Sequence, residues 1–236
     1  MKKLIILLLF LGVIGLAISY HQARVKALGE ALIADAYYGK LDEVKDDLED
    51  GADLNFTFFF SDSEREYNGV TFNALQAAAS SGNEDVINYL LEQHLDINAQ
   101  TPTGWTPLFI AARDGRTEAA KLLIFREANV NLPTDLGATP LLMAITQPYP
   151  TEEERLNLIT YLLDNEANPN LATHEGLTPL YYAAVTYRAD VVKILVENKA
   201  SLTPEVYKHT IHYLNTHPNK DNKKIMTLLK KAVSSK

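Results

Sequence analysis

Cysteine is absent from the 236 residues of this chain. Its absence excludes disulfide bonds, zinc sites built on thiolates, iron–sulfur clusters and a cysteine nucleophile. Glycine and proline are sparse, at 11 and 10 residues, and 47% of the residues are hydrophobic. These proportions exclude a collagen-like or disordered chain and leave one or two ordinary folded units. A chain without thiols also suits an oxidising compartment.

Positive charge is scarce in the body of the chain. Residues 20–203 contain 13 Lys and Arg against 28 Asp and Glu, a net charge of −15. Such a body repels phosphate backbones, so we expect no nucleic-acid partner. Residues 204–236 instead contain seven Lys against two acidic residues, a net charge of +5. We interpret this basic tail as a solvated capping helix, with contact to an anionic surface as the alternative.

Familiar catalytic motifs are missing as well. The sequence contains no G-x-x-x-x-G-K, no G-x-G-x-x-G, no G-x-S-x-G and no H-E-x-x-H. His209 and His212 could share one helix face, but no carboxylate or thiolate follows at ligand spacing, which favours solvated side chains. The acidic residues from Asp42 to Asp53 fail the spacing of a calcium-binding EF-hand loop and are interpreted as a solvated helix face. We therefore expect no enzyme activity, no cofactor and no metal site.

The N-terminus has the pattern of a targeting segment. Lys2 and Lys3 precede an uncharged, apolar run over residues 4–18, and the next charge comes only after residue 23. A helix over residues 4–23 would be about 30 Å long, the thickness of a bilayer core. Residues 17–19 loosely resemble a cleavage site. Residues 1–20 are thus predicted to be a signal peptide or, as we favour, a signal-anchor transmembrane segment. The body is expected on the periplasmic side of the inner membrane, or in the periplasm or secreted after cleavage.

Three segments of the sequence repeat each other. Gly104–Leu108, Gly137–Leu141 and Gly176–Leu180 share the pattern G-x-T-P-L, and each precedes an alanine-rich turn and a leucine-rich helix. Thr caps the first free N–H groups of a helix, and Pro at the first position has no N–H to leave unpaired. The loops that close these units end 33, 39 and 33 residues apart, at Asn98, Asn131, Asn170 and Thr203. An earlier copy closes at Asn55.

This period and these motifs resemble the ankyrin repeat family, over about residues 30–203. The resemblance implies an all-α, ankyrin-type helical solenoid over residues 21–203, with short hairpin fingers between helix pairs. It would follow the N-terminal apolar signal or anchor helix and end in basic capping helices over residues 204–236. The repeats are expected at about residues 28–55, 69–98, 102–131, 135–170 and 174–203. Two insertions break the period: one begins at Phe56, and the other spans Gln147–Arg155.

The resemblance also implies a binding face. In such solenoids the fingertips and first helices line a concave surface that contacts other proteins. The residues that map to it are Phe72, Trp105, Leu177, Thr103, Leu136, His174, Glu175, Arg113, Asp114, Gln147 and Thr186. Trp105 is the expected anchor because tryptophan often dominates interfaces. Phe59 and Phe60 belong to an apolar run that serves either this interface or local packing. The family's usual His after T-P-L is replaced by Phe109, Leu142 and Tyr181.

These features predict a non-enzymatic, monomeric protein–protein interaction module. It would be exported or membrane-anchored and would bind another protein on its concave acidic face. Two narrower roles remain as alternatives: an immunity or inhibitor protein against an envelope toxin or hydrolase, and an accessory factor that stabilises an envelope enzyme. A membrane, contacted through residues 4–20 if these are not cleaved, is the second expected partner.

Overall fold

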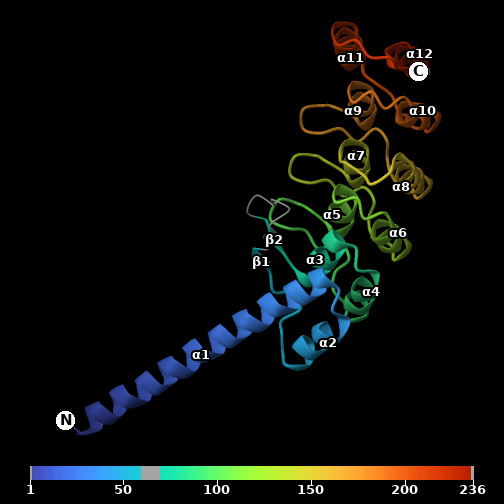
Figure 1. Cartoon of the computed structure of the whole chain (residues 1–236). Coiled ribbons are helices and arrows are strands. Elements are labelled where there is room, and N and C mark those ends of the chain that lie inside the picture. The colour runs from blue at the N-terminus through green and yellow to red at the C-terminus, as the bar shows by residue number, and fades with distance from the viewer. Residues whose placement is uncertain (1, 60–69, 235–236) are drawn as a thin grey trace.

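The computed structural model describes residues 2–59 and 70–234, together with the side chains of residues 14–58 and 70–233. Within this part of the chain, the helices stand in two columns that run side by side (Figure 1). The inner column contains α1 (Lys2–Tyr38), α3 (Ala74–Ser81), α5 (Pro107–Arg113), α7 (Pro140–Thr146), α9 (Pro179–Val185) and α11 (Pro204–Thr216). The outer column contains α2 (Leu41–Glu49), α4 (Glu84–Glu92), α6 (Thr117–Phe125), α8 (Glu152–Asp164), α10 (Ala189–Glu197) and α12 (Asn222–Ser234). The helical solenoid that the sequence predicts is confirmed.

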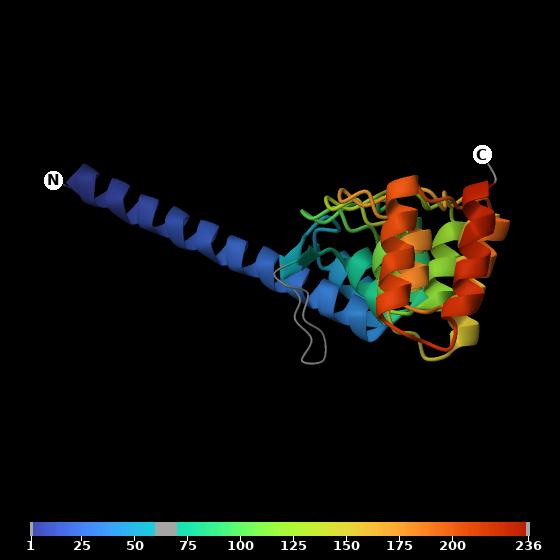
Figure 2. The same ribbon diagram turned by 90° about the horizontal axis from the view of Figure 1, so that it is seen from above.

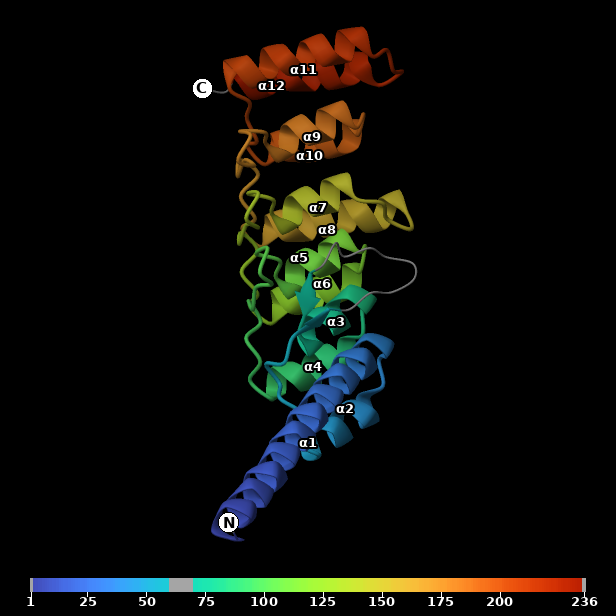
Figure 3. The same ribbon diagram turned by 90° about the vertical axis from the view of Figure 1, so that its left-hand side faces the viewer.

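Successive helices of each column pack directly on one another. α3, α5, α7 and α9 form one continuous stack, and α4, α6, α8 and α10 form the other. α11 packs against α9 and α12 against α10, so the C-terminal helices continue both columns. In Figure 3 the long loops between helix pairs lie along one edge of the stack, and the turns within the pairs lie along the opposite edge.

The Thr-Pro pairs begin the inner helices. The side chains of Thr106, Thr139 and Thr178 accept hydrogen bonds from the backbone N–H three residues later, at 3.1, 3.3 and 3.5 Å. A proline follows each threonine at the first helical position. Asn73 begins α3 by a capping box, in which Asn73 and Gln76 each accept the other's backbone N–H at 2.9 Å. These caps satisfy N–H groups that have no partner inside the helix.

The core lies between the two columns. The outer helices contribute leucines that are 0% exposed, namely Leu90, Leu123, Leu162 and Leu195. The inner helices contribute alanines that are also 0% exposed, among them Ala78, Ala111, Ala144 and Ala183. Small side chains on the inner column let neighbouring helices approach closely. Each buried leucine stabilises the fold by about 1.5–3 kcal/mol, and part of that burial comes from the adjacent pair.

A row of asparagines joins the loops. The side-chain oxygens of Asn98, Asn131 and Asn170 each accept a hydrogen bond at 2.8 Å from the backbone of the following loop. These are the positions at which the sequence shows the closing Asn of each unit. The bonds hold neighbouring loops together, and they lie on the same edge as the fingers.

The first insertion contains a short ribbon. β1 (Phe58–Phe59) pairs antiparallel with β2 (Thr71–Phe72). The side chain of Phe58 packs against a buried cluster on α1 and α3, which makes it a local packing residue. Phe60 and the side chain of Phe59 lie outside the described residues, so their predicted contact with a partner stays a prediction.

The second insertion, residues 147–155, folds against the third repeat. The hydroxyl of Tyr149 donates a hydrogen bond to the carbonyl of Ala112, at 2.5 Å. The guanidinium of Arg155 lies 5.3 Å from the centre of the Tyr149 ring, and Arg155 is only 5% exposed. Burial raises the pKa of the Tyr149 hydroxyl above its usual range, which keeps it protonated as a donor.

α1 is one unbroken helix with two different halves. Residues 14–24 are exposed, whereas Leu32, Ile33 and Ala36 are buried against α3 and the first insertion. The N-terminal half projects away from the stack, as Figure 2 shows. The helix thus continues across residue 20, where the targeting segment is expected to end. Among the residues described, no helix combines the length and apolarity needed to cross a membrane. The side chains of residues 2–13, which carry most of the apolar run, lie outside that description.

The carboxylate of Asp47, in the first repeat, lies in a place that disfavours its charged form. The Oδ2 atom of Asp47 is buried and has no hydrogen-bond partner among the described residues. Burial, together with the charges of Asp35 and Asp50, raises the pKa of Asp47 from 3.8 to about 6. The folded state therefore binds a proton more tightly than the unfolded state does. The contribution of Asp47 to stability is most favourable below pH 4 and is lost as the pH rises through 6.

We predict that Asp47→Asn raises the free energy of unfolding at pH 7, because the amide carries no charge to bury. The gain should shrink towards zero at pH 4, where the native carboxyl is already protonated. Urea unfolding at several pH values, followed by circular dichroism, measures the difference. Asp42→Asn is the matched control, since the Asp42 side chain is 92% exposed and should give no gain. A gain for Asp47→Asn that is equal at pH 4 and pH 7 would contradict the prediction.

Candidate functional site

The fingers are tight turns that present their tips to solvent. The backbone N–H groups of Thr101, Thr134 and Thr173 donate to the carbonyl four residues later, at 3.0, 2.8 and 3.0 Å. A glycine with φ near +80° closes each turn, and L side chains rarely adopt this conformation. At Gly137 there is also no room for a side chain, because a Cβ atom would lie only 3.0 Å from the backbone of the next finger.

Adjacent fingers are joined by their backbones. Asp135 donates its N–H to the carbonyl of Thr103 at 3.2 Å, and His174 donates to the carbonyl of Leu136 at 3.1 Å. The side chains of Thr103, His174 and Glu175 are exposed, and Leu136 is 75% exposed. The fingertip residues expected on the binding face are therefore accessible, on a row that the inter-finger bonds keep in register.

A groove lies between the last two fingers and the inner helices behind them. Its volume is about 330 Å³. It is lined by Leu136, Ala138, Leu142, Met143, Thr146, Thr173, His174, Glu175 and Tyr182. We call it the finger groove. α7 supplies Leu142, Met143 and Thr146, α9 supplies Tyr182, and the two fingertips supply the rest.

Three of the predicted binding residues share the finger groove: Leu136, His174 and Glu175. The α7 and α9 residues of its lining were not predicted from the sequence. One signal was present, because Leu142 stands where the family usually has His, and an apolar side chain there gives the groove an apolar base. Leu177 is half-buried beside the groove and does not line it.

Trp105 lies in a different environment from the one expected. It is half-buried and packs on Phe109, with ring centres 5.5 Å apart, at the edge of a small apolar cluster. The guanidinium of Arg113 lies 4.7 Å from the Trp105 ring and pairs with Asp114 at 3.2 Å. These contacts make Trp105 a packing residue as well as a surface residue, and its role as the anchor of a partner contact stays a prediction.

Phe72 was expected on the binding face, and the structure corrects this. Its side chain is 0% exposed and belongs to the same cluster as Val70 and Ile110. The reason is the ribbon. Phe72 in β2 pairs with Phe58 in β1, and its side chain packs into the cluster. The sequence could not show this, since it places Phe72 only by analogy with the T-P lines.

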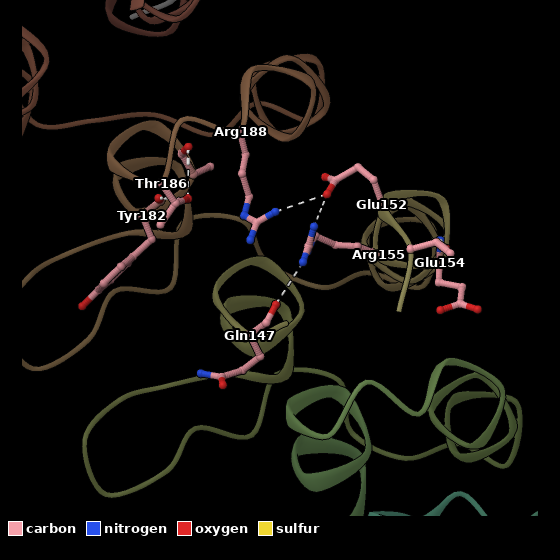
Figure 4. Close-up of polar contacts among 9 residues, drawn as sticks. Gln147, Glu152, Glu154, Arg155, Tyr182, Thr186 and Arg188 are labelled. Atoms are coloured by element: carbon pink, nitrogen blue, oxygen red, sulfur yellow. Dashed lines mark hydrogen bonds and ion pairs between the residues drawn. The ribbon is translucent and has the colours of Figure 1, made fainter. Parts of the chain in front are cut away.

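Gln147 and Thr186 lie at the turn edge, away from the lining of the finger groove. The carbonyl of Gln147 accepts a hydrogen bond from Arg155 at 3.2 Å, and Arg155 also pairs with Glu152 (Figure 4). Glu152 in turn pairs with Arg188 at 3.3 Å. Thr186 donates its hydroxyl to the carbonyl at position 182 at 2.7 Å. Figure 4 shows the Tyr182 side chain pointing away from this cluster.

Within the described residues, no three His, Asp or Glu side chains come together in a way that could hold a metal ion. His209 and His212 line a shallow hollow with Lys208 on α11. The finger groove thus combines a partly apolar lining with exposed fingertips.

The family follows from a comparison with protein-family models. A model of ankyrin repeats in three copies matches residues 32–134, 74–170, 128–206 and 151–235. The chain belongs to the ankyrin repeat family. Ankyrin repeats are generally protein–protein interaction modules and typically act as non-enzymatic scaffolds. A comparison with curated protein sequences finds no match. In this ankyrin repeat protein the matches extend through α11 and α12, in agreement with their place in the stack.

We predict that Trp105→Ala lowers the free energy of unfolding by about 2 kcal/mol, roughly half the cost of removing a fully buried large aromatic side chain. Leu136→Ala is the control, because a side chain that is 75% exposed should contribute within about 0.5 kcal/mol. Urea unfolding followed by circular dichroism measures both. Equal, negligible effects would show that the Trp105 cluster adds nothing to the fold.

Proposed function

We propose that this chain is a non-enzymatic binding protein that holds a partner protein against its fingertips, with the finger groove as the main contact. The observation that carries the proposal is the groove itself. It brings the exposed Leu136 together with the half-buried Met143 and Tyr182 on one accessible surface. Contiguous apolar surface on a soluble domain is costly, and it commonly marks an interaction site.

The geometry of the groove also favours a protein partner. Its base is formed by rigid helices, and its rim by fingertips whose backbones are bonded to each other. Met143 is unbranched and polarisable, so it adapts to the shape of an inserted side chain. A preformed groove of this kind binds with little ordering cost, because the residues that line it are already fixed.

The test compares two exposed apolar residues, one that lines the finger groove and one that does not. Leu136 lies in the finger groove and Phe125 ends α6 on the outer column, and each is 75% exposed. Leu136→Ala should reduce recovery of the partner in an affinity pull-down from the native envelope by about tenfold, the scale of a moderate interface residue. Phe125→Ala should leave recovery unchanged. Equal recovery with both variants would reject the finger groove as the binding site.

We also propose that the protein works outside the cytosol, exported or anchored by its N-terminal segment. Lys2 and Lys3 followed by the uncharged run to residue 23 support this, as does the absence of cysteine. The exposed residues Leu16, Ile18 and Tyr20 on the projecting half of α1 are consistent with it. The charge of −15 over residues 20–203 favours a basic partner, which is what an inhibitor or accessory factor of a basic envelope protein would require.

A reporter enzyme that is active only after export, fused behind residue 236, should be active in cells. A second reporter, active only in the cytosol, should be silent in the same position. Replacing residues 4–18 with a polar linker is the control, and it should reverse both results. Activity of the cytosolic reporter on the intact chain would overturn the proposal, and the mass of the mature protein distinguishes anchor from cleaved signal.

A further inference from the structure

The last three fingers carry charge of one sign only. The loops 95–105, 128–138 and 167–177 contain Asp96, Asp135 and Glu175, and no Lys or Arg. Glu175 lines the finger groove, and Asp135 directly precedes Leu136 on its rim. Both side chains are exposed. In the part of the chain that the structure describes, no ion pair includes either of them.

The helices behind the groove do not balance this charge. α7 and α9 contain no charged residue over their whole lengths. Two arginines in the neighbouring repeats are engaged elsewhere, since Arg113 at the end of α5 pairs with Asp114 and Arg188 before α10 pairs with Glu152. An uncharged, apolar wall beside two exposed carboxylates concentrates their field in the groove.

The base of the finger groove is apolar. Leu142 is 4% exposed and Met143 is half-buried, and Tyr182 lines the groove from α9. A volume of about 330 Å³ is small for a cofactor site and suits the end of a large side chain. The chemistry of the groove is thus an apolar base with an acidic rim.

We propose that the partner inserts an apolar side chain flanked by Lys or Arg into the finger groove. The apolar side chain packs between Leu136, Met143 and Tyr182, and the cationic neighbour pairs with Glu175 or Asp135. This rests on the proposed function, and it adds the chemistry of the partner. Exposed ion pairs contribute modestly to affinity, but they select the partner and speed its approach. The acidic rim therefore decides which apolar segment binds.

The experiment selects a phage library of random peptides on the full-length protein. Leu136→Ser serves to identify peptides that need the groove, and Phe125→Ser is the matched control for loss of an exposed apolar side chain. Peptides that depend on the groove should carry a Leu, Ile, Met or aromatic residue with Lys or Arg close by. The double variant Asp135→Lys/Glu175→Lys should instead select peptides with Asp or Glu at those places. Circular dichroism confirms that each variant is folded.

A synthetic copy of one selected peptide gives the quantitative test. The variant Asp135→Asn/Glu175→Gln should bind it about three- to tenfold more weakly at low salt, as expected for two exposed pairs. The difference in affinity between the variant and the native protein should vanish near 1 M salt, where the Debye screening length falls to about 3 Å. Peptides that need Leu136 but show no basic preference would overturn this inference and leave the proposed function standing. Selection that is indifferent to Leu136 would overturn both.

Discussion

Every helix pair in this chain has an apolar face that only the next pair can cover. Leu123, for example, is 0% exposed because side chains from both neighbouring pairs close around it. Stability is therefore shared between neighbours, and no single repeat is a folding unit by itself. This constraint also decides what happens at the ends, where α1 covers the first face and α11 with α12 covers the last. The fingers and their groove exist because the stack sets a fixed spacing for the loops.

Much of the fold could be predicted because its signals are local. The caps at Thr106, Thr139 and Thr178 depend on residues within one turn of helix, and the asparagine row depends on a constant period. The continuity of α1 across residue 20 was less evident. That segment contains no proline, and its glycines at positions 12 and 15 lie inside the helix without ending it. An export signal and a helix of the stack also look alike in composition.

The candidate site was predictable only in part, for a physical reason. Fingertip residues such as Leu136 and Glu175 are exposed in any repeat of this kind, so their position alone indicates access. Tyr182 and Met143 are only half-buried, and how much of each stays accessible depends on the position of the neighbouring finger. No local sequence pattern encodes that position. Phe72 shows the converse, because a ribbon formed by an insertion buries a residue that the period places at the surface.

The second insertion has a mechanical consequence. Through Tyr149 it bonds to α5, and through Arg155 and Glu152 it connects to Arg188 before α10, so contacts cross three repeats along the turn edge. A stack of repeats can bend elastically. Contacts that join several repeats along the turn edge resist bending that would open this edge. Hydrogen bonds at the same turn edge, from Asn83 to the carbonyl of Tyr37 and from Arg116 to the carbonyl of Ser80, connect the first three repeats as well, so this stiffness extends along the array.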